Sequence, residues 1–158
     1  MMNHKTEKLQ NDLINIPNLD VITNHHDLKR LSRDFYNYSP ILQKKLDGCL
    51  ADIVVRPKNI ESLITVSKLC WNLSIPLTIR GGGTGNYGQA VPLTKGIVLQ
   101  MNYFNKVEKY YPDSGFVKVQ SGCLMGDLNR ELGKHGRELR LFPSTWKTAS
   151  IGGFIAGG

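Results

Sequence analysis

A cluster of glycines at residues 80–89 has the composition of an anion-binding loop. Five of the eight residues from 81 to 88 are glycine. Residues without a Cβ let backbone N–H groups converge on an anion, and Thr84 and Asn86 add side-chain donors. Arg80 adds a positive charge where the loop begins. A tight turn needs only one or two glycines, so the pattern favours a phosphate-binding site.

Two common nucleotide motifs match this loop by spacing alone. Residues 83–88 fit G-x-G-x-x-G, but the dinucleotide fold needs a helix to begin there, and Pro92 interrupts the segment that follows. The next predicted strand also does not end in an acidic residue for a ribose. The same span has the length of a P-loop, but Gln89 and Ala90 stand where a lysine and a serine or threonine are required. The sequence therefore disfavours both motifs.

A second glycine-rich segment at residues 149–156 follows Pro143, Ser144 and Thr145. Ser150 is placed to cap a short helix that runs through Phe154. The N-terminus of a helix attracts anions, so a structural cap and a contact with a phosphate are compatible roles for this segment.

Strands and helices alternate around the glycine loop. The β-branched run at residues 52–56 predicts a strand, and Asn59 predicts the cap of a helix whose apolar positions recur every three or four residues up to Leu73. Residues 77–79 predict a second strand, parallel to the first. A third strand is expected at residues 96–101.

The following residues predict a hairpin and a second helix. Residues 106–111 and 116–120 alternate around a turn rich in Pro, Asp and Gly. Leucines at 124, 128 and 132 indicate a helix, and residues 139–141 are a candidate short strand. The aromatic, turn-rich stretch 34–40 is expected to pack across the domain.

Composition and charge exclude several classes of protein. Hydrophobic residues make up 41% and charged residues 21%, as in globular proteins. The net charge of +7 is scattered, so we expect no nucleic-acid partner. Cys49, Cys70 and Cys123 lie far apart, so we expect no metal site. Without a signal sequence or a transmembrane segment, the expected location is cytoplasmic.

From about Asp52 to Gly158, these motifs in this order resemble the N-terminal FAD-binding half of the p-cresol methylhydroxylase/vanillyl-alcohol oxidase (PCMH-type) superfamily. The chain is most similar to FAD-linked oxidases of the glycolate oxidase flavin subunit and D-lactate dehydrogenase group. The resemblance implies an α+β fold, with a small parallel βαβ lobe and part of a second, mainly antiparallel lobe with helices. It divides the chain into an N-terminal lead-in, 1–45, and an FAD-binding domain, 46–158, that is incomplete at its C-terminus.

The resemblance also implies which residues bind FAD. Residues 81–85 would hold the diphosphate through backbone amides, and residues near Ser150 would approach the diphosphate and the ribityl chain. Residues 143–145 would lie near the adenine side or the middle of the flavin, and Gly122 would let a strand pass the cofactor. Some members attach FAD to a histidine where this chain has Thr84, so non-covalent binding is expected. The implied cofactor-binding set is Arg80, Gly81, Gly82, Gly83, Thr84, Gly85, Asn86, Gly122, Pro143, Ser144, Thr145, Ser150, Ile151, Gly152 and Gly153.

The implied function is that of a flavin-dependent oxidoreductase acting on a small 2-hydroxy acid or a similar alcohol. In the family, catalytic groups usually come from a later cap domain, so no catalytic residue is assigned, and His135 is interpreted as a surface residue. Three hypotheses follow: a fragment inactive by itself, a split flavin-binding module that needs a partner chain, or an independent phosphate- or nucleotide-binding protein. The terminal glycine pair favours a truncated chain.

Overall fold

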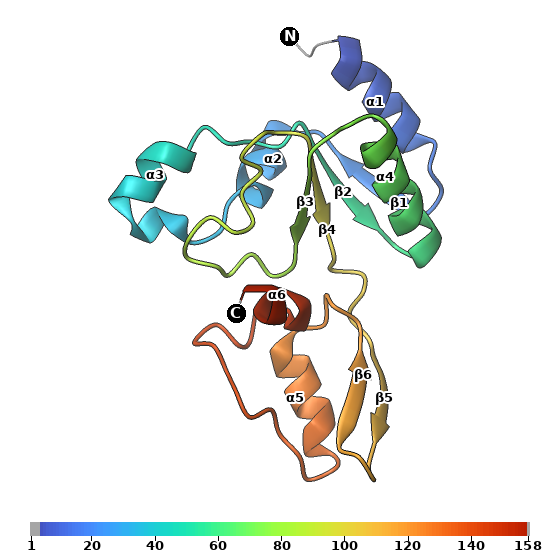
Figure 1. Ribbon diagram of the computed structural model, residues 1–158, viewed down its shortest axis with the longest axis vertical. Coiled ribbons are helices and arrows are strands. Elements are labelled where there is room, and N and C mark those ends of the chain that lie inside the picture. The colour runs from blue at the N-terminus through green and yellow to red at the C-terminus, as the bar shows by residue number, and fades with distance from the viewer. Residues whose placement is uncertain (1–3, 158) are drawn as a thin grey trace.

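A four-stranded sheet forms the N-terminal lobe in the computed structural model, which describes residues 4–157 (Figure 1). Residues 1–3 of the expected lead-in and Gly158 of the terminal glycine pair lie outside the described residues. The strands are β1 (Leu19–Ile22), β2 (Ile53–Pro57), β3 (Leu77–Arg80) and β4 (Ile97–Gln100), in the spatial order β1-β2-β4-β3.

Strand β4 lies between the two strands that the sequence predicted as a parallel pair. Ile97 of β4 is in register with Ile53 of β2 on one side and with Leu77 of β3 on the other, and both pairings are parallel. Strand β1 pairs with β2 in the antiparallel direction. The predicted strands and their parallel direction are therefore confirmed, while β3 lies at an edge of the sheet.

Helices cover both faces of this sheet. Helices α1 (His4–Ile14) and α4 (Ile60–Asn72) pack on one face, where Ile53 and Val55 are buried. Val54 points to the other face and packs with Leu31 at the end of α2 (His25–Leu31). Strands covered on both sides are hydrophobic at successive positions, which explains the unbroken apolar run of β2.

The start of α4 is fixed by its own residues. The Asn59 side chain accepts a hydrogen bond from the backbone N–H of Ser62 at 2.9 Å, and the Ser62 hydroxyl lies 3.5 Å from the Asn59 backbone nitrogen. This reciprocal capping box confirms the predicted cap.

A short 3₁₀-helix, η1 (Tyr36–Tyr38), and helix α3 (Pro40–Leu46) connect α2 to β2. Tyr36 is fully buried, whereas Phe35 and Tyr38 are exposed, so this stretch packs into the domain through Tyr36. Figure 1 shows α3 and the long loop after β3 on the same side of the sheet.

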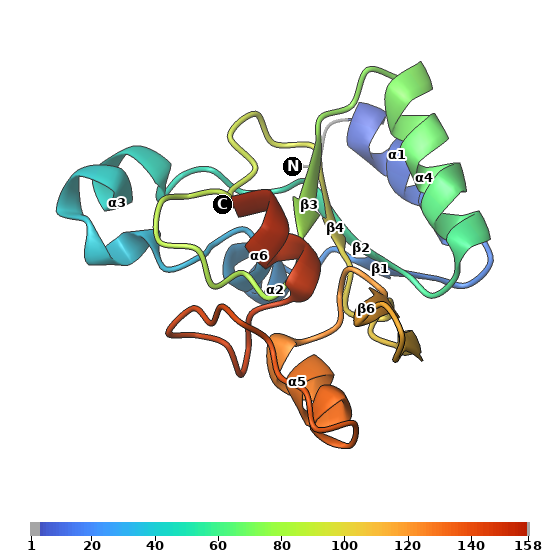
Figure 2. The ribbon, with the colours of Figure 1, turned by 60° about the horizontal axis from the view of Figure 1, so that its bottom comes forward.

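The second lobe consists of a hairpin and the helices that follow it. Strands β5 (Val107–Tyr111) and β6 (Phe116–Val119) pair in the antiparallel direction, and α5 (Met125–Gly133) packs against them through Leu128 and Leu132. Helix α6 (Ile151–Gly157) lies where the two lobes meet, close to the end of β3 in both ribbon views (Figures 1 and 2).

The candidate strand at residues 139–141 was a wrong prediction. These residues have no strand pairing in the described structure, and Leu141 is largely exposed. The N–H of Leu139 donates to the Asn129 side chain at 2.9 Å. A side chain of α5 thus takes the hydrogen bond that a neighbouring strand would supply.

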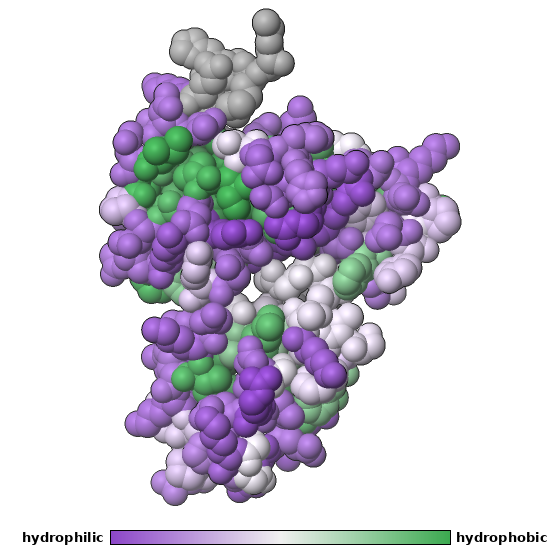
Figure 3. Space-filling model, turned by 180° about the vertical axis from the view of Figure 1, so that it is seen from behind, coloured by the Kyte–Doolittle hydropathy of each residue, from purple (hydrophilic) through white to green (hydrophobic). Residues whose placement is uncertain are grey.

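The outer surface is mainly hydrophilic on the face opposite to Figure 1, with smaller hydrophobic areas on each lobe (Figure 3). Within the described range, no helix has both the length and the apolar character that crossing a bilayer requires.

The expected lead-in adds α1, β1, α2 and α3 to the fold. Leu13 of α1 is fully buried in the same cluster as Ile97 and Leu99 of β4. Whether a separate FAD-binding domain begins near residue 46 stays a prediction.

We expect Leu13→Ala to destabilise the protein by about 2–5 kcal/mol, because it leaves a cavity between α1 and the sheet. The adjacent Ile14→Ala is the control, since Ile14 is 56% exposed, and it should cost less than about 0.5 kcal/mol. Urea unfolding of both variants measures the difference. Equal, small losses would show that α1 does not stabilise this lobe.

Candidate functional site

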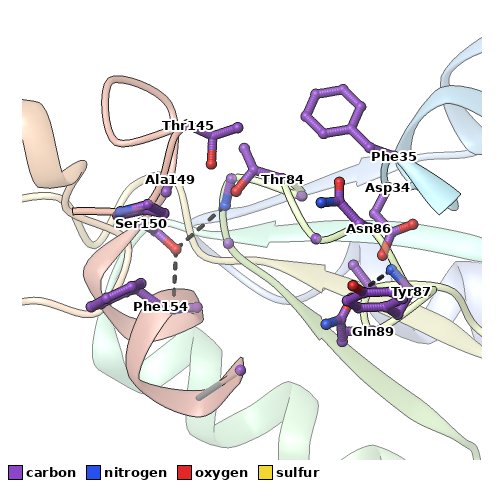
Figure 4. A pocket seen from close by; sticks show the side chains of 18 of the residues that line it. Asp34, Phe35, Thr84, Asn86, Tyr87, Gln89, Thr145, Ala149, Ser150 and Phe154 are labelled. Carbon is purple, nitrogen blue, oxygen red and sulfur yellow. Dashed lines mark hydrogen bonds between the residues drawn. The ribbon is translucent and has the colours of Figure 1, made fainter. Parts of the chain in front are cut away.

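The two glycine-rich segments meet at Ser150. The Ser150 hydroxyl accepts a hydrogen bond from the N–H of Gly82 at 3.4 Å and another from the N–H of Gly153 at 3.2 Å (Figure 4). The first bond joins the loop after β3 to the second lobe, and the second caps α6. Residues separated by 68 positions in the sequence are therefore adjacent.

The loop and the second segment approach so closely that side chains do not fit between them. A Cβ on Gly81 would overlap the Ser150 hydroxyl, and a Cβ on Gly82 would overlap the carbonyl oxygen of Thr148. Gly83 has φ of +67°, a conformation that glycine adopts readily and other residues rarely do. Gly81 and Gly82 therefore shape the junction between the lobes, while Gly83 shapes the loop over Arg80.

A cavity of about 800 Å³ opens beside this junction, within the usual size range of small-molecule sites. It is bounded by the glycine loop on one side and by residues of the second lobe on the other (Figure 4). Most of the sequence-predicted residues line it, namely Gly81, Gly82, Gly83, Thr84, Gly85, Asn86, Pro143, Ser144, Thr145, Ser150 and Gly153.

The loop offers free hydrogen-bond donors to this cavity. The N–H groups of residues 83–86 donate no hydrogen bond to the rest of the described protein. Residues 83–86 are part-exposed or exposed, so these donors are open to solvent or to a ligand, and successive free donors in a turn are suited to an anion. The described residues that line the cavity include no lysine or arginine, so backbone and hydroxyl groups would make the direct contacts with an anion.

Arg80 lies behind the loop and outside the large cavity. Its guanidinium donates to the carbonyl oxygen of Arg33 at 2.5 Å and occupies the space where a Cβ of Gly83 would lie. The residue is only 8% exposed, and desolvation lowers the pKa of its guanidinium. An arginine remains charged in proteins, so a buried positive charge lies directly beneath the free amides.

Three other predicted residues lie away from the large cavity. Gly122 lines a smaller cavity together with Arg80, and a Cβ there would overlap the carbonyl oxygen of Met101. The N–H groups of Ile151 and Gly152 donate to the carbonyl oxygens of Cys123 and Ser121, both at 2.8 Å. These residues join α6 to the second lobe, so their contact with a cofactor stays a prediction.

Sequence reasoning missed part of the cavity wall. Asp34, Phe35 and Tyr38 come from the connection between α2 and α3, while Tyr87 and Gln89 extend the glycine loop. The aromatic character of residues 34–40 was visible in the sequence, but nothing in it indicated that this segment lies against the loop.

His135 matches its sequence interpretation as a surface residue, and two of the three cysteines lie in the core. His135 is exposed and stacks on Tyr110 with the ring centroids 4.6 Å apart. Cys70 and Cys123 are buried, and desolvation raises the pKa of both thiols, which disfavours the nucleophilic thiolate.

Comparisons of the sequence identify related proteins. Glycolate oxidase subunit GlcD of Escherichia coli (strain K12) is 33% identical over 104 residues, which are 66% of this chain and 21% of that protein. The D-lactate dehydrogenase of Archaeoglobus fulgidus is 35% identical over 104 residues, which are 66% of this chain and 23% of that protein. The chain thus spans less than a quarter of the length of these relatives.

Comparisons of the structure show the same fold in larger proteins. Alkyldihydroxyacetonephosphate synthase gives a TM-score of 0.78 at 18% identity, covering 99% of this chain and 29% of that one. Aclacinomycin oxidoreductase gives 0.65 at 16% identity, covering 89% of this chain and 27% of that one. These likenesses confirm the expected PCMH-type fold.

The family comparison covers the glycine loop and the second glycine segment together. Residues 51–158 match the family described as FAD binding domain, which confirms FAD as the cofactor that the sequence resemblance implied. This match extends over more than half of the chain, so the chain belongs to the FAD binding domain family.

Proposed function

We propose that this chain is the FAD-binding portion of a flavin-dependent oxidoreductase that oxidises a small 2-hydroxy acid or a similar alcohol. The observation that carries the proposal is the row of N–H groups at residues 83–86 that have no acceptor in the described structure, in a loop that lines a cavity with Ser150 and its neighbours on the far side. Backbone donors presented this way suit a diphosphate, which is the most highly charged part of FAD.

The loop offers that group hydrogen-bond donors with a positive charge behind them, while Asp34 is the charged residue among the described residues that line the cavity itself. Residues 81–86 line the cavity on one side, and the Ser150 and Thr145 side chains line the opposite wall. The buried Arg80 guanidinium adds positive potential beneath the loop without occupying the cavity. Charge held in a desolvated position acts more strongly than charge on the surface.

Bound FAD would supply the hydride-accepting chemistry, and this chain would bind and orient it. We infer non-covalent binding, because Thr84 stands where some members of the family carry the histidine that attaches the cofactor. The sequence-predicted set from Arg80 to Asn86, with Gly122 and residues 143–145 and 150–153, is proposed as the binding site. No catalytic residue is assigned among the residues of this chain.

The substrate class is inferred from relatives. Glycolate oxidase, D-lactate dehydrogenase and D-2-hydroxyglutarate dehydrogenase are each named for a 2-hydroxy acid. Because this chain corresponds to 21% of the first of them, substrate-binding groups are proposed to come from outside it, either from a longer chain or from a partner.

We expect Gly83→Val to reduce the flavin content of the purified protein at least tenfold, roughly the effect of losing 1.4 kcal/mol of binding. A β-branched residue at φ of +67° is strained, and its side chain would displace Arg80. Gly115→Val is the matched control, since Gly115 has φ of +70° in the hairpin turn with open space around it. Equal flavin retention in both variants would refute the loop assignment.

Acid precipitation of the flavin-loaded protein should release the flavin into the supernatant, as expected of a cofactor held by hydrogen bonds alone. Absorbance of the supernatant and the pellet measures the distribution. Flavin that remains in the washed pellet would contradict non-covalent binding.

A version of the protein that includes any sequence beyond Gly158 should purify yellow and lose its visible flavin absorbance when a D-2-hydroxy acid is added without oxygen. Bleaching that appears only after a second protein is supplied would support the split-module hypothesis. A colourless protein that binds ADP but no flavin would favour an independent nucleotide-binding role.

A further inference from the structure

Helix α4 carries a second apolar face that no part of the described structure covers. Its inner side packs on the sheet through Val66 and Cys70. Nearly opposite to them, Ile60, Ile64 and Trp71 are 51%, 46% and 86% exposed. At about 100° of rotation per residue, their spacings of four and seven residues bring these three side chains into one narrow stripe along the helix. Large apolar side chains gathered on a surface are typical of an interaction site.

This stripe lies apart from the proposed flavin site. Helix α4 is on the outer side of the N-terminal lobe, away from α6 and the second lobe (Figures 1 and 2). Among the described residues that line the large cavity, none belongs to α4. The binding of FAD therefore gives no reason for the exposure of these side chains.

Two opposite charges lie along one flank of the stripe. Glu61 and Lys68 are both exposed, and their spacing of seven residues points them in nearly the same direction, about 10 Å apart along the helix. Ion pairs along a helix form between residues three or four apart, so these two residues do not serve each other. Within the described range neither forms any ion pair, so both are available to charges on another molecule.

A second copy of α4 that runs antiparallel to the first complements the stripe. Around a two-fold axis through the middle of the helix, each contact between two positions occurs twice. Ile60 then faces Trp71 of the other copy at both ends, and Ile64 faces Ser67 of the other copy near the axis. Ser67 is small, and its hydroxyl already donates to the carbonyl oxygen of Leu63 at 2.8 Å, so it leaves room for Ile64 without an unpaired donor.

The same arrangement also pairs the charges. Equivalent flanks of two antiparallel helices face each other, so Glu61 of each copy lies opposite Lys68 of the other copy. Charges that flank an apolar seam determine the choice of partner and its orientation. A parallel pair would instead bring this charged flank against the uncharged flank formed by Leu63 and Ser67. The charges therefore favour the antiparallel pair.

We propose that α4 is a self-association surface, through which two copies of this protein pair by antiparallel packing of Ile60, Ile64 and Trp71. The helix has 13 residues and is therefore about 20 Å long. A contact of this length buries a small area, so the dimer is weak and reversible rather than permanent.

Sedimentation of the parent protein between roughly 1 µM and 1 mM should show the mass rising from one copy to two. Trp71→Ser should weaken this dimerisation at least tenfold, because it removes the largest side chain from both ends of the contact, while urea unfolding stays unchanged. Leu93→Ser is the matched control, since Leu93 is 64% exposed outside α4 and the cavity, and it should dimerise like the parent. A parent that stays monomeric, or a Trp71→Ser variant that dimerises like the parent, would overturn the proposal.

A charge exchange tests the antiparallel arrangement. Glu61→Lys and Lys68→Glu each place like charges opposite each other, so each variant alone should dimerise roughly tenfold more weakly. They change the net charge in opposite directions, so a loss in both does not come from net charge. An equimolar mixture of the two, and the double variant, should regain the dimerisation of the parent.

Single charge variants that dimerise like the parent, or a mixture and a double variant that fail to recover, would overturn the antiparallel pair. The flavin content should be the same in all of these variants, because α4 lies outside the cavity. A failure of this proposal would therefore leave the proposed function untouched, and a loss of flavin in the parent would leave this proposal untouched.

Discussion

The close packing of Gly81 against the Ser150 side chain and of Gly82 against the Thr148 main chain is the contact on which the arrangement of the two lobes depends. It joins the two lobes, fixes the direction of the loop after β3 and leaves a cavity beside the junction. Any side chain at Gly81 or Gly82 would separate the lobes before it touched a ligand. The glycines are therefore needed for the packing of the two lobes as well as for the proposed binding loop. A count of glycines alone does not reveal the first role.

Elements determined by neighbouring residues could be predicted from the sequence. Asn59 caps α4 with its own side chain, and the turn before Phe116 determines the hairpin. Elements that depend on distant partners could not be predicted in the same way. The position of β4 between β2 and β3 depends on how three strands assemble, and residues 139–141 lack a strand because Asn129 bonds with Leu139.

The candidate site shows the same difference between residues that the local sequence reveals and residues that only the folded chain brings together. The glycine loop and Ser150 were visible because their residue types are unusual for their positions. Asp34 and Phe35 were invisible as cavity residues, because only the folded chain brings the connection after α2 against Gly85. Gly122 and Gly152 carried a signal, but their lack of a side chain is explained by contact with Met101 and Ser121.

The hydroxyl of Ser150 has a further chemical consequence. A serine oxygen has two lone pairs, and here both face backbone donors, from Gly82 and from Gly153. The remaining hydrogen-bonding group of the hydroxyl is its hydrogen, which must point away from both amides. Toward a ligand in the cavity, Ser150 can therefore act only as a hydrogen-bond donor. The two backbone N–H groups impose this role before a ligand binds.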